Sequence, residues 1–357
     1  MGTLHVKFHF AVPGLWVDHA LLGRRYRATF EGRRIFLQLP AREGDFGIGD
    51  STQYYPLIAG GIQSPDGQWN TVKLTMVRIG IEIPVDFSIP PVPIEPDLFR
   101  KITDLLGVAA EISKSFLKSY LDLVSVKAGQ HWLGTQAQTP ELTWITQVHD
   151  EHGNDTHIGF GGTGATILVH HKDSAITESI QADLLRSVER GTQIPIAESF
   201  LRDAKFLALE GKDAAQTMIC AAIACELKVK GALVDLASPG QVELVNLMIG
   251  KSREFSLAVS ALFDKGCKAV AGKSMRESDK ALFVAAAKLF EARNAIAHRG
   301  ESPSMGEVRG HVAIAVRVFE WMDRLASDLR EPARTARSHH RLKIRNSSTL
   351  RQQARRP

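Results

Sequence analysis

The sequence predicts an α+β protein, in which a β-rich N-terminal domain precedes an all-α helical bundle. Apolar and polar residues alternate in the first 88 positions, whereas apolar residues recur at steps of three and four after Pro195. A cluster of prolines lies between these two patterns. We therefore expect a β-rich domain (1–88), a Pro-rich junction with a long helix and a β-hairpin that can also complete the N-terminal domain (89–190), a helical bundle (191–330) and a disordered basic tail (331–357).

The N-terminal segment has the pattern of an antiparallel sheet. Residues 4–12 alternate between apolar and more polar positions, as in a strand with one buried face. Two further alternating runs flank Glu31-Gly32, which predicts a hairpin turn there. In residues 72–83 the alternation changes parity after Met76, which predicts a β-bulge near that residue.

Five prolines, at positions 84, 90, 91, 93 and 96, lie around the start of the junction, where neither a helix nor a central strand continues easily. From Asp97 the apolar spacing predicts a helix that ends by Gly129. Residues 141–149 and 158–171 are expected to form two strands around the turn-rich segment 151–155.

The helical region contains several helix start and stop signals. Gly211 is expected to end a first helix, and Asp213 to cap the next one. A later helix begins at about Ser278, and Ser304 with Glu307 forms a capping box for the last long helix. Their apolar stripes can be buried together in a bundle of four or more helices.

Composition limits the classes of protein to consider. The 357 residues are 44% hydrophobic and 23% charged, which is typical of a globular protein. No apolar run is long enough to cross a membrane and no signal peptide is recognisable, so the expected location is cytoplasmic, with no membrane partner. Three cysteines are too few for a disulfide framework, and we expect Cys220 and Cys225 to be small core residues.

The net charge of +5 is unevenly distributed. Residues 331–357 carry eight Lys or Arg and one acid, a net of +7, so the rest of the chain sums to −2. Such a tail can bind phosphate backbones without sequence preference, or it can simply aid solubility.

The helix that precedes Gly300 carries the most informative motif. Its expected buried stripe consists of Leu282, Ala285, Leu289, Ala292 and Ile296. Arg293, Asn294 and His298 lie off this stripe, and Asn294 and His298 share a helix face because they are four residues apart. A guanidinium, an amide and an imidazole are groups that can bind phosphate and move a proton.

This pattern resembles the R-x4-6-H motif of the HEPN (higher eukaryote and prokaryote nucleotide-binding) superfamily. The string Arg293-Asn294-x-x-x-His298-x-Gly300 is similar to the form in ApeA-type HEPN domains of bacterial anti-phage systems. The resemblance covers roughly the last 130 to 140 residues before the tail. It implies a metal-independent endoribonuclease without a cofactor, whose site forms where two protomers bring their motifs together.

The resemblance assigns catalytic roles to Arg293, Asn294 and His298, and RNA and a second copy of the chain as partners. It also implies a role in abortive infection or as a toxin, with the N-terminal half recognising an invader-derived trigger or restraining the catalytic half. Further candidates for contacts with RNA phosphates are Arg299, Arg334, Arg337, Arg341, Lys343 and Arg345.

Other functions remain open at this point. Arg293 can pair with Glu291 or Glu301, while His298 contacts carbonyls of the last helical turn, which would make the motif structural. Gly300 replaces the Tyr of the R-x4-H-x-Y toxin branch, so a non-catalytic RNA-binding, nucleotide-binding or dimerisation protein is the main alternative. The cluster between His149 and His157, with His170 and His171, could bind a divalent metal, although a polar hairpin tip explains it better.

The glycine-rich segment 159–164 has the letters of a dinucleotide-binding loop. Because the residues that follow it have a strand pattern instead of a helical one, we reject that function.

Overall fold

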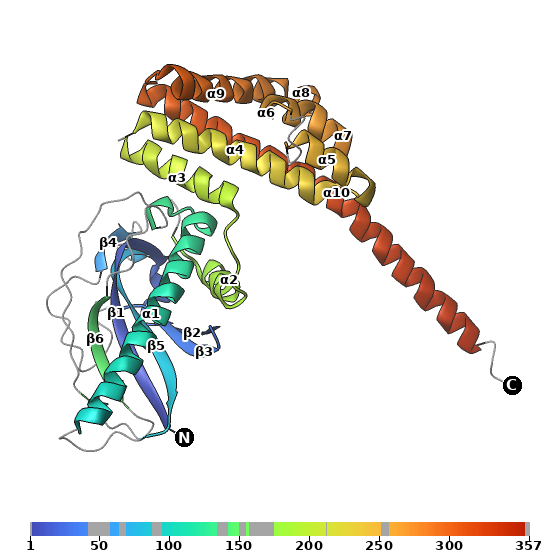
Figure 1. The fold of residues 1–357 in the computed structure, drawn as a ribbon. Coiled ribbons are helices and arrows are strands. Elements are labelled where there is room, and N and C mark those ends of the chain that lie inside the picture. The colour runs from blue at the N-terminus through green and yellow to red at the C-terminus, as the bar shows by residue number, and fades with distance from the viewer. Residues whose placement is uncertain are drawn as a thin grey trace. The chain divides into compact units, whose positions relative to one another are not determined.

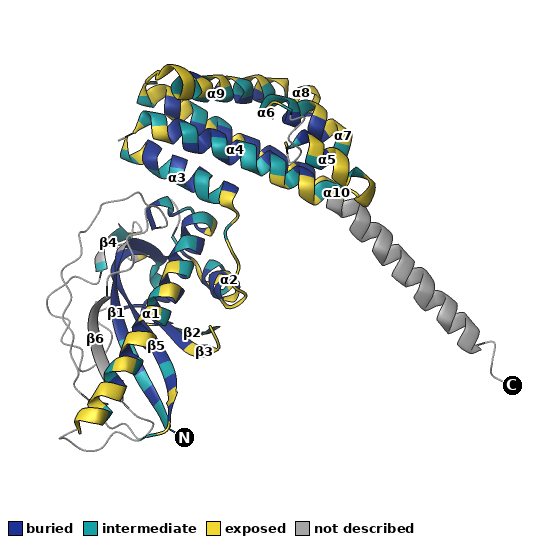
Figure 2. Cartoon of the chain, in the orientation of Figure 1, coloured by how far each residue is buried: buried dark blue, intermediate teal, exposed yellow. Residues whose placement is uncertain are grey.

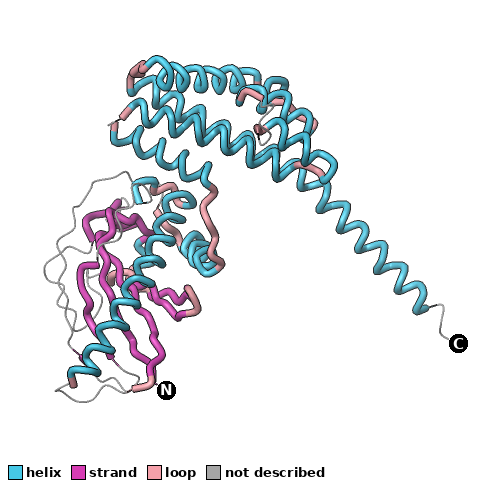
Figure 3. Tube along the Cα trace, viewed as in Figure 1, coloured by secondary structure: helices cyan, strands magenta, loops and turns pink. Residues whose placement is uncertain are grey.

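A computed structural model describes residues 2–41, 58–63, 69–87, 95–133, 142–149, 155–156, 175–211, 213–250 and 257–353; for 13, 59–60, 69, 142–149, 155–156 and 330–353 it describes the backbone alone. The chain forms two compact units, Met1–Ile194 and Pro195–Pro357. The first unit contains a sheet with helices and the second is helical, which confirms the predicted α+β class (Figure 3).

The first unit is built on one antiparallel sheet of seven strands (Figure 1). The strand order is β2-β3-β5-β1-β6-β7, and β4 also pairs with β5. The strands are β1 (Gly2–Asp18), β2 (Arg25–Phe30), β3 (Arg33–Gln38), β4 (Ile58–Gln63), β5 (Trp69–Val85), β6 (Leu142–His149) and β7 (Asp155–Thr156).

The predicted division at residue 88 does not separate two units of the structure. Strand β6, from the segment after the prolines, pairs with β1 in the same sheet. This agrees with the alternative in which residues 89–190 complete the N-terminal domain. The second unit begins at Pro195, shortly after the predicted boundary. The strand predicted over 158–171 lies outside the described residues.

The β2–β3 hairpin confirms the turn predicted at Glu31-Gly32. Both turn residues have positive φ angles, 49° at Glu31 and 71° at Gly32. A two-residue turn of this kind matches the right-handed twist of the two strands it connects.

The predicted bulge near Met76 lies on the partner strand instead. The β1–β5 register shifts between Ala11 and Leu15, whose partners are Met76 and Leu74. Pro13 has no N–H to donate to the ladder, and Gly14 has a φ of 80°. These two residues give β1 its extra length, and the indole N–H of Trp132 donates to the carbonyl of Gly14 at 2.9 Å.

The apolar face of the sheet packs against the long helix α1 (Pro96–Lys127), whose end before Gly129 confirms the prediction. The Phe116 ring of α1 meets the Phe30 ring of β2 edge to face, with 5.7 Å between centroids. Buried Tyr120 donates a hydrogen bond of 2.6 Å to Gln181 of α2 (Glu178–Glu189). Short 3₁₀ turns follow β1 at His19–Leu21 and α1 at His131–Leu133.

The second unit packs its helices around one apolar core (Figure 2). Its long helices are α3 (Ile196–Glu210), α4 (Ala214–Leu236), α9 (Lys280–Arg299) and α10 (Met305–Gln353). Between α4 and α9 lie the short segments η4 (Pro239–Gln241), α5 (Val242–Met248), α6 (Val259–Ala261), η5 (Leu262–Gly266), α7 (Cys267–Ala271) and α8 (Met275–Ser278).

Several predicted helix signals of this unit are confirmed. Gly211 follows α3 in the left-handed conformation, and Asp213 accepts a hydrogen bond from the N–H of Gln216 at 2.8 Å. Glu307 and Ser304 form the capping box of α10. All three cysteines are buried, and burial raises the pKa of Cys220 to about 11 and that of Cys267 to about 12. These thiols are therefore unreactive core groups.

Helix α10 differs from the predicted tail, because its backbone continues as a helix to Gln353. The prediction of disorder rested on the scarcity of apolar residues after position 330. The segment is, however, rich in Arg, Ala, Lys, Leu and Gln, whose good helix propensity favours a continuous helix. In the part of the chain that is described, no helix is both long and apolar enough to cross a membrane.

Replacing Phe116 with alanine should destabilise the first unit by about 3–5 kcal/mol, because the Phe116 side chain is fully buried against the sheet. Urea unfolding followed by tryptophan fluorescence measures this, since four of the five tryptophans precede residue 195. Phe99→Ala on the same helix is the control: its ring is 47% exposed, and a change within about 0.5 kcal/mol is expected. Equal losses in the two variants would contradict the packing of α1.

A buried histidine should make the first unit sensitive to acid. His9 accepts a hydrogen bond from Nε of Arg78 at 2.8 Å. Its burial, together with the charges of Arg78 and Lys7, lowers the pKa of His9 to about 3. Between pH 6.5 and about 3, the His9 side chain is therefore protonated in the unfolded chain but neutral in the folded protein.

The stability of the first unit should fall as the pH decreases below 6.5, by up to about 1.4 kcal/mol for each pH unit from His9 alone. His9→Gln keeps an acceptor for Arg78 but does not titrate, so its urea midpoint should vary less over this range. Parallel pH profiles for the two proteins would show that His9 is not the responsible group.

Candidate functional site

The candidate site lies on α9, whose N-terminus is held by a side-chain cap. Asp279 accepts a hydrogen bond from the N–H of Leu282 at 2.9 Å, close to the predicted start at Ser278. One face of α9 then packs into the helical core through Leu282, Ala286 and Leu289. The buried stripe includes Ala286 where Ala285 was expected, while Ala292 and Ile296 pack against the edge of the core.

The C-terminus of α9 has the predicted glycine stop. Gly300 adopts a φ of 66°, and its N–H donates to the carbonyl of Ile296 at 3.0 Å. This bond and the left-handed glycine are those of the αL motif of helix ends, and the N–H of Glu301 also lies 3.5 Å from the carbonyl oxygen of Ala295. The last turn of the helix is therefore defined by backbone geometry, and its side chains are available for other interactions.

Arg293, Asn294 and His298 all lie on the last two turns of α9. Asn294 and His298 are exposed and Arg293 is half-buried. A guanidinium N–H of Arg293 donates to Oδ1 of Asn294 at 3.1 Å. Arg293 starts about 140° around the helix axis from His298, and this hydrogen bond directs its guanidinium toward the Asn294–His298 face.

Arg293 does not form the ion pair with Glu291 or Glu301 that would give it a structural role. Glu301, one of its two possible partners, accepts instead from Nε of Arg299 at 2.5 Å. Within the described chain, Arg293 forms no ion pair with a carboxylate, and the His298 ring has no hydrogen-bond partner. Both groups thus keep donors for an external anion, whereas the charge of Arg299 is already neutralised.

The chemistry of these groups is that of phosphate binding and proton transfer. A guanidinium offers a planar set of donors that matches phosphate oxygens. Imidazole can both accept and donate a proton, and the imidazole of His298 lies here in the last helical turn. One chain supplies one imidazole at this position, so a reaction that needs an acid and a base together requires a second group.

Other predicted sites lie outside the described residues or side chains. The backbone of α10 includes Arg334, Arg337, Arg341, Lys343 and Arg345, but their contacts with RNA remain a prediction. Of the histidine-rich cluster only His149, Asp155 and Thr156 have a described backbone, in which His149 pairs with Asp155. Where side chains are described, no group of three or more His, Cys, Asp or Glu could hold a metal ion. The glycine-rich segment 159–164 also lies outside the description.

A pocket of about 380 Å³ occurs in the first unit, lined by Lys127, Ser179, Ile180 and Asp183. Lys127 donates to Asp183 at 2.5 Å and to Ser187 at 2.7 Å, so its charge is satisfied within the pocket. The hydrogen bond and charge of Lys127 lower the pKa of Asp183. The pocket is therefore a surface hollow in which an ion pair connects α1 to α2. None of the residues predicted to be functional lines it.

One group of candidate functional residues was not predicted from the sequence, the arginines of the β2–β3 hairpin. Arg25 and Arg27 alternate along β2, and Arg34 lies on β3 opposite Thr29. The alternation of charge was a visible signal. The position of these arginines on one face of the sheet depends, however, on strand pairing that the sequence alone does not give.

No family model, no curated protein and no solved structure matches this chain.

Replacing Gly300 with alanine should destabilise the helical unit by about 1 kcal/mol, because alanine is strained at a φ of 66°. Gly310 in α10 is the matched control: it has no neighbour within 4 Å of an added Cβ, and Gly310→Ala should stabilise the helix by about 0.5–1 kcal/mol. Thermal unfolding followed by circular dichroism measures both changes. Opposite signs are expected, and a stabilised Gly300→Ala variant would contradict the helix end described above.

Proposed function

We propose that the helical unit is a metal-independent endoribonuclease of the HEPN type, acting as a cytoplasmic defence or toxin effector. The observation that carries this proposal is the grouping of Arg293, Asn294 and His298 at the exposed end of α9, without a carboxylate partner for Arg293 in the described chain. The resemblance of these residues to the HEPN motif supplies the reaction type.

In this reaction the RNA provides its own nucleophile, the 2′-hydroxyl next to the scissile phosphate. His298 of one protomer takes the proton of that hydroxyl while the 2′-oxygen bonds to phosphorus. The bond from phosphorus to the 5′-oxygen breaks, and His298 of the partner subunit donates a proton to that oxygen. The products are a 2′,3′-cyclic phosphate and a 5′-hydroxyl end.

Arg293 and Asn294 stabilise the phosphate during this step. Arg293 places its guanidinium donors on the phosphate oxygens, where negative charge accumulates. Asn294 accepts from Arg293 at 3.1 Å and so orients the guanidinium, while its amide N–H groups are directed at the sugar or the phosphate. Two imidazoles brought close together differ in protonation, because each charge opposes the other, which favours one base and one acid.

In the full protein we assign the first unit the recognition of an invader-derived trigger. Its sheet contains no described catalytic cluster, which agrees with a sensory role. The main alternative is a non-catalytic RNA-binding or dimerisation protein, and the specific observation in its favour is the glycine at position 300 in place of a tyrosine.

The substitution His298→Ala should reduce RNA cleavage by about 100-fold or more, because it removes the group that moves protons. The measurement is the rate of cleavage of a fluorescent single-stranded RNA in the presence of EDTA, with analysis of the product ends. Lys288→Ala is the control on an exposed position of the same helix, and it should cleave at the normal rate.

Three outcomes would reject the proposal. Unchanged cleavage by the His298→Ala variant would remove His298 from the reaction. Complete inhibition by EDTA would point to a metal enzyme, for which the cluster between His149 and His157 is the candidate. RNA binding without cleavage by the unmodified protein would favour the non-catalytic alternative.

A further inference from the structure

The second face of the sheet in the first unit carries an ordered array of polar and charged side chains. Strand register brings them into three rows across β2, β3, β5 and β1. We call this array the basic face; its rows are Arg25-Gln38-Arg78-His9, Arg27-Phe36-Gly80-Lys7 and Thr29-Arg34-Glu82-His5. The residues between them in sequence point to the apolar face, which packs against α1.

The basic face has a large excess of positive charge. Its rows contain five Lys or Arg side chains, and Glu82 is the one carboxylate among them. Glu82 lies 3.6 Å from a guanidinium nitrogen of Arg34 and 3.9 Å from Nδ1 of His5. Among the described residues of the three rows, this carboxylate stands beside three exposed arginines, Arg25, Arg27 and Arg34.

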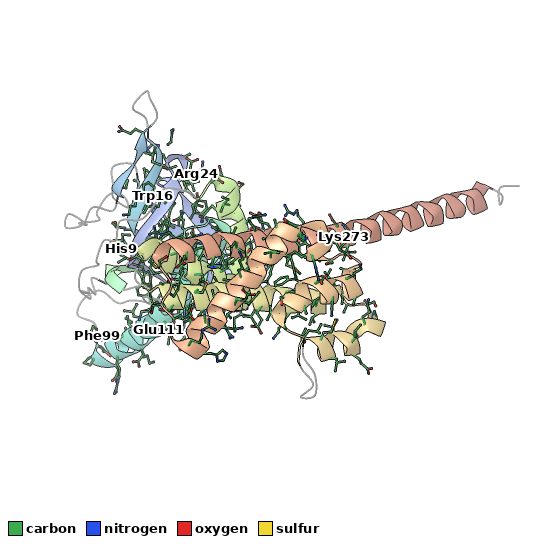
Figure 4. All side chains as sticks on the ribbon, turned by 90° about the horizontal axis from the view of Figure 1, so that it is seen from above. His9, Trp16, Arg24, Phe99, Glu111 and Lys273 are labelled. Atoms are coloured by element: carbon green, nitrogen blue, oxygen red, sulfur yellow. The ribbon has the colours of Figure 1, made fainter. Side chains whose placement is uncertain are left out.

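The outer part of the basic face is open to solvent. Arg25, Arg27 and Arg34 are exposed residues at the hairpin end of the sheet. Within the described chain, neither Arg25 nor Arg27 forms an ion pair with a carboxylate. Arg24, between α2 and the same hairpin, shows the contrast, because it pairs with Glu178 of α2 (Figure 4).

An aromatic ring orders the two free arginines. The guanidinium carbon of Arg25 lies 3.7 Å from the centre of the Phe36 ring, and that of Arg27 lies 5.8 Å away. The ring lies beside Gly80, where an added Cβ would be 3.5 Å away, an ordinary van der Waals distance. Partial burial, and after it the charge of Arg27, lower the pKa of Arg25.

We propose that the basic face binds the sugar-phosphate backbone of single-stranded RNA, with Arg25, Arg27 and Arg34 as the phosphate contacts. Bound phosphates relieve the repulsion between Arg25 and Arg27, and planar guanidinium groups also stack on unpaired bases. The choice of RNA over other polyanions rests on the proposed ribonuclease function. The inference assigns the first unit a role in substrate recruitment beside the recognition of a trigger.

The test measures binding separately from cleavage. The full chain carrying His298→Ala is titrated, in EDTA, against a fluorescein-labelled oligouridylate, and anisotropy gives the Kd at several salt concentrations. The triple variant Arg25→Ala, Arg27→Ala, Arg34→Ala should bind at least about tenfold more weakly near physiological salt, and the slope of log K against log salt should fall by about 2, since each lost contact on a single strand contributes about 0.7.

Two further variants make the result specific. The triple variant Arg25→Lys, Arg27→Lys, Arg34→Lys keeps the charge, so it should retain most of the salt slope. The control Arg100→Ala, Lys101→Ala, Lys118→Ala removes three exposed cations from α1 and should change the Kd by less than about twofold. The basic tail is present in every protein, so its contribution cancels in the comparison.

Equal binding by the arginine triple variant and the α1 control would overturn the inference. So would arginine-dependent binding to vesicles of phosphatidylserine without any effect on RNA, because that would identify a lipid surface as the partner. Either result leaves the His298 cleavage assay unaffected. Conversely, arginine-dependent RNA binding in a chain that never cleaves RNA would reject the nuclease and retain the basic face.

Discussion

The arrangement of the helical unit depends on one constraint, the burial of a single face of α9 in the apolar core. Leu282 and Leu289 fix the rotation of the helix, and Gly300 fixes the residue at which it ends. Once rotation and end are fixed, Arg293, Asn294 and His298 have to lie on the remaining surface. The position of the polar groups is thus a consequence of apolar packing.

An exposed ion pair also connects the turn between α7 and α8 to α10. It is formed by Lys273, labelled in Figure 4, and Asp328, whose charged atoms lie 2.7 Å apart.

Local features of the fold could be predicted from the sequence because their causes are local. The caps at Asp213, Asp279 and Ser304 and the stops at Gly211 and Gly300 each depend on residues within one or two turns. The turn at Glu31-Gly32 is of the same kind. Of the candidate site, the position of Asn294 and His298 on one exposed face could be predicted from their spacing, whereas the pairing of Arg299 with Glu301 could not.

Features that depend on distant pairing could not be predicted. The parity change at Met76 is correct as a pattern, but its cause is Pro13-Gly14 on β1, which only the strand register places opposite. The basic face also depends on the pairing of distant strands. Its arginines are spread over β2, β3 and β5, and the charge of the chain outside the tail averages to −2, so composition conceals a local excess of positive charge.

The arginines of the basic face and Arg293 of α9 have different surroundings, which suit them to different contacts with RNA. Arg25, Arg27 and Arg34 lie on one face of a sheet, with the carboxylate of Glu82 beside Arg34, which suits repeated contact with a backbone of regular charge. Arg293 is held by one amide beside one imidazole, which suits a single phosphate. A cleavage that needs acid and base together cannot be completed by one His298, because one ring is either protonated or not. The chemistry proposed for α9 therefore requires a second proton-transfer group, which we propose a second copy of the chain supplies, whereas retention of RNA on the sheet does not.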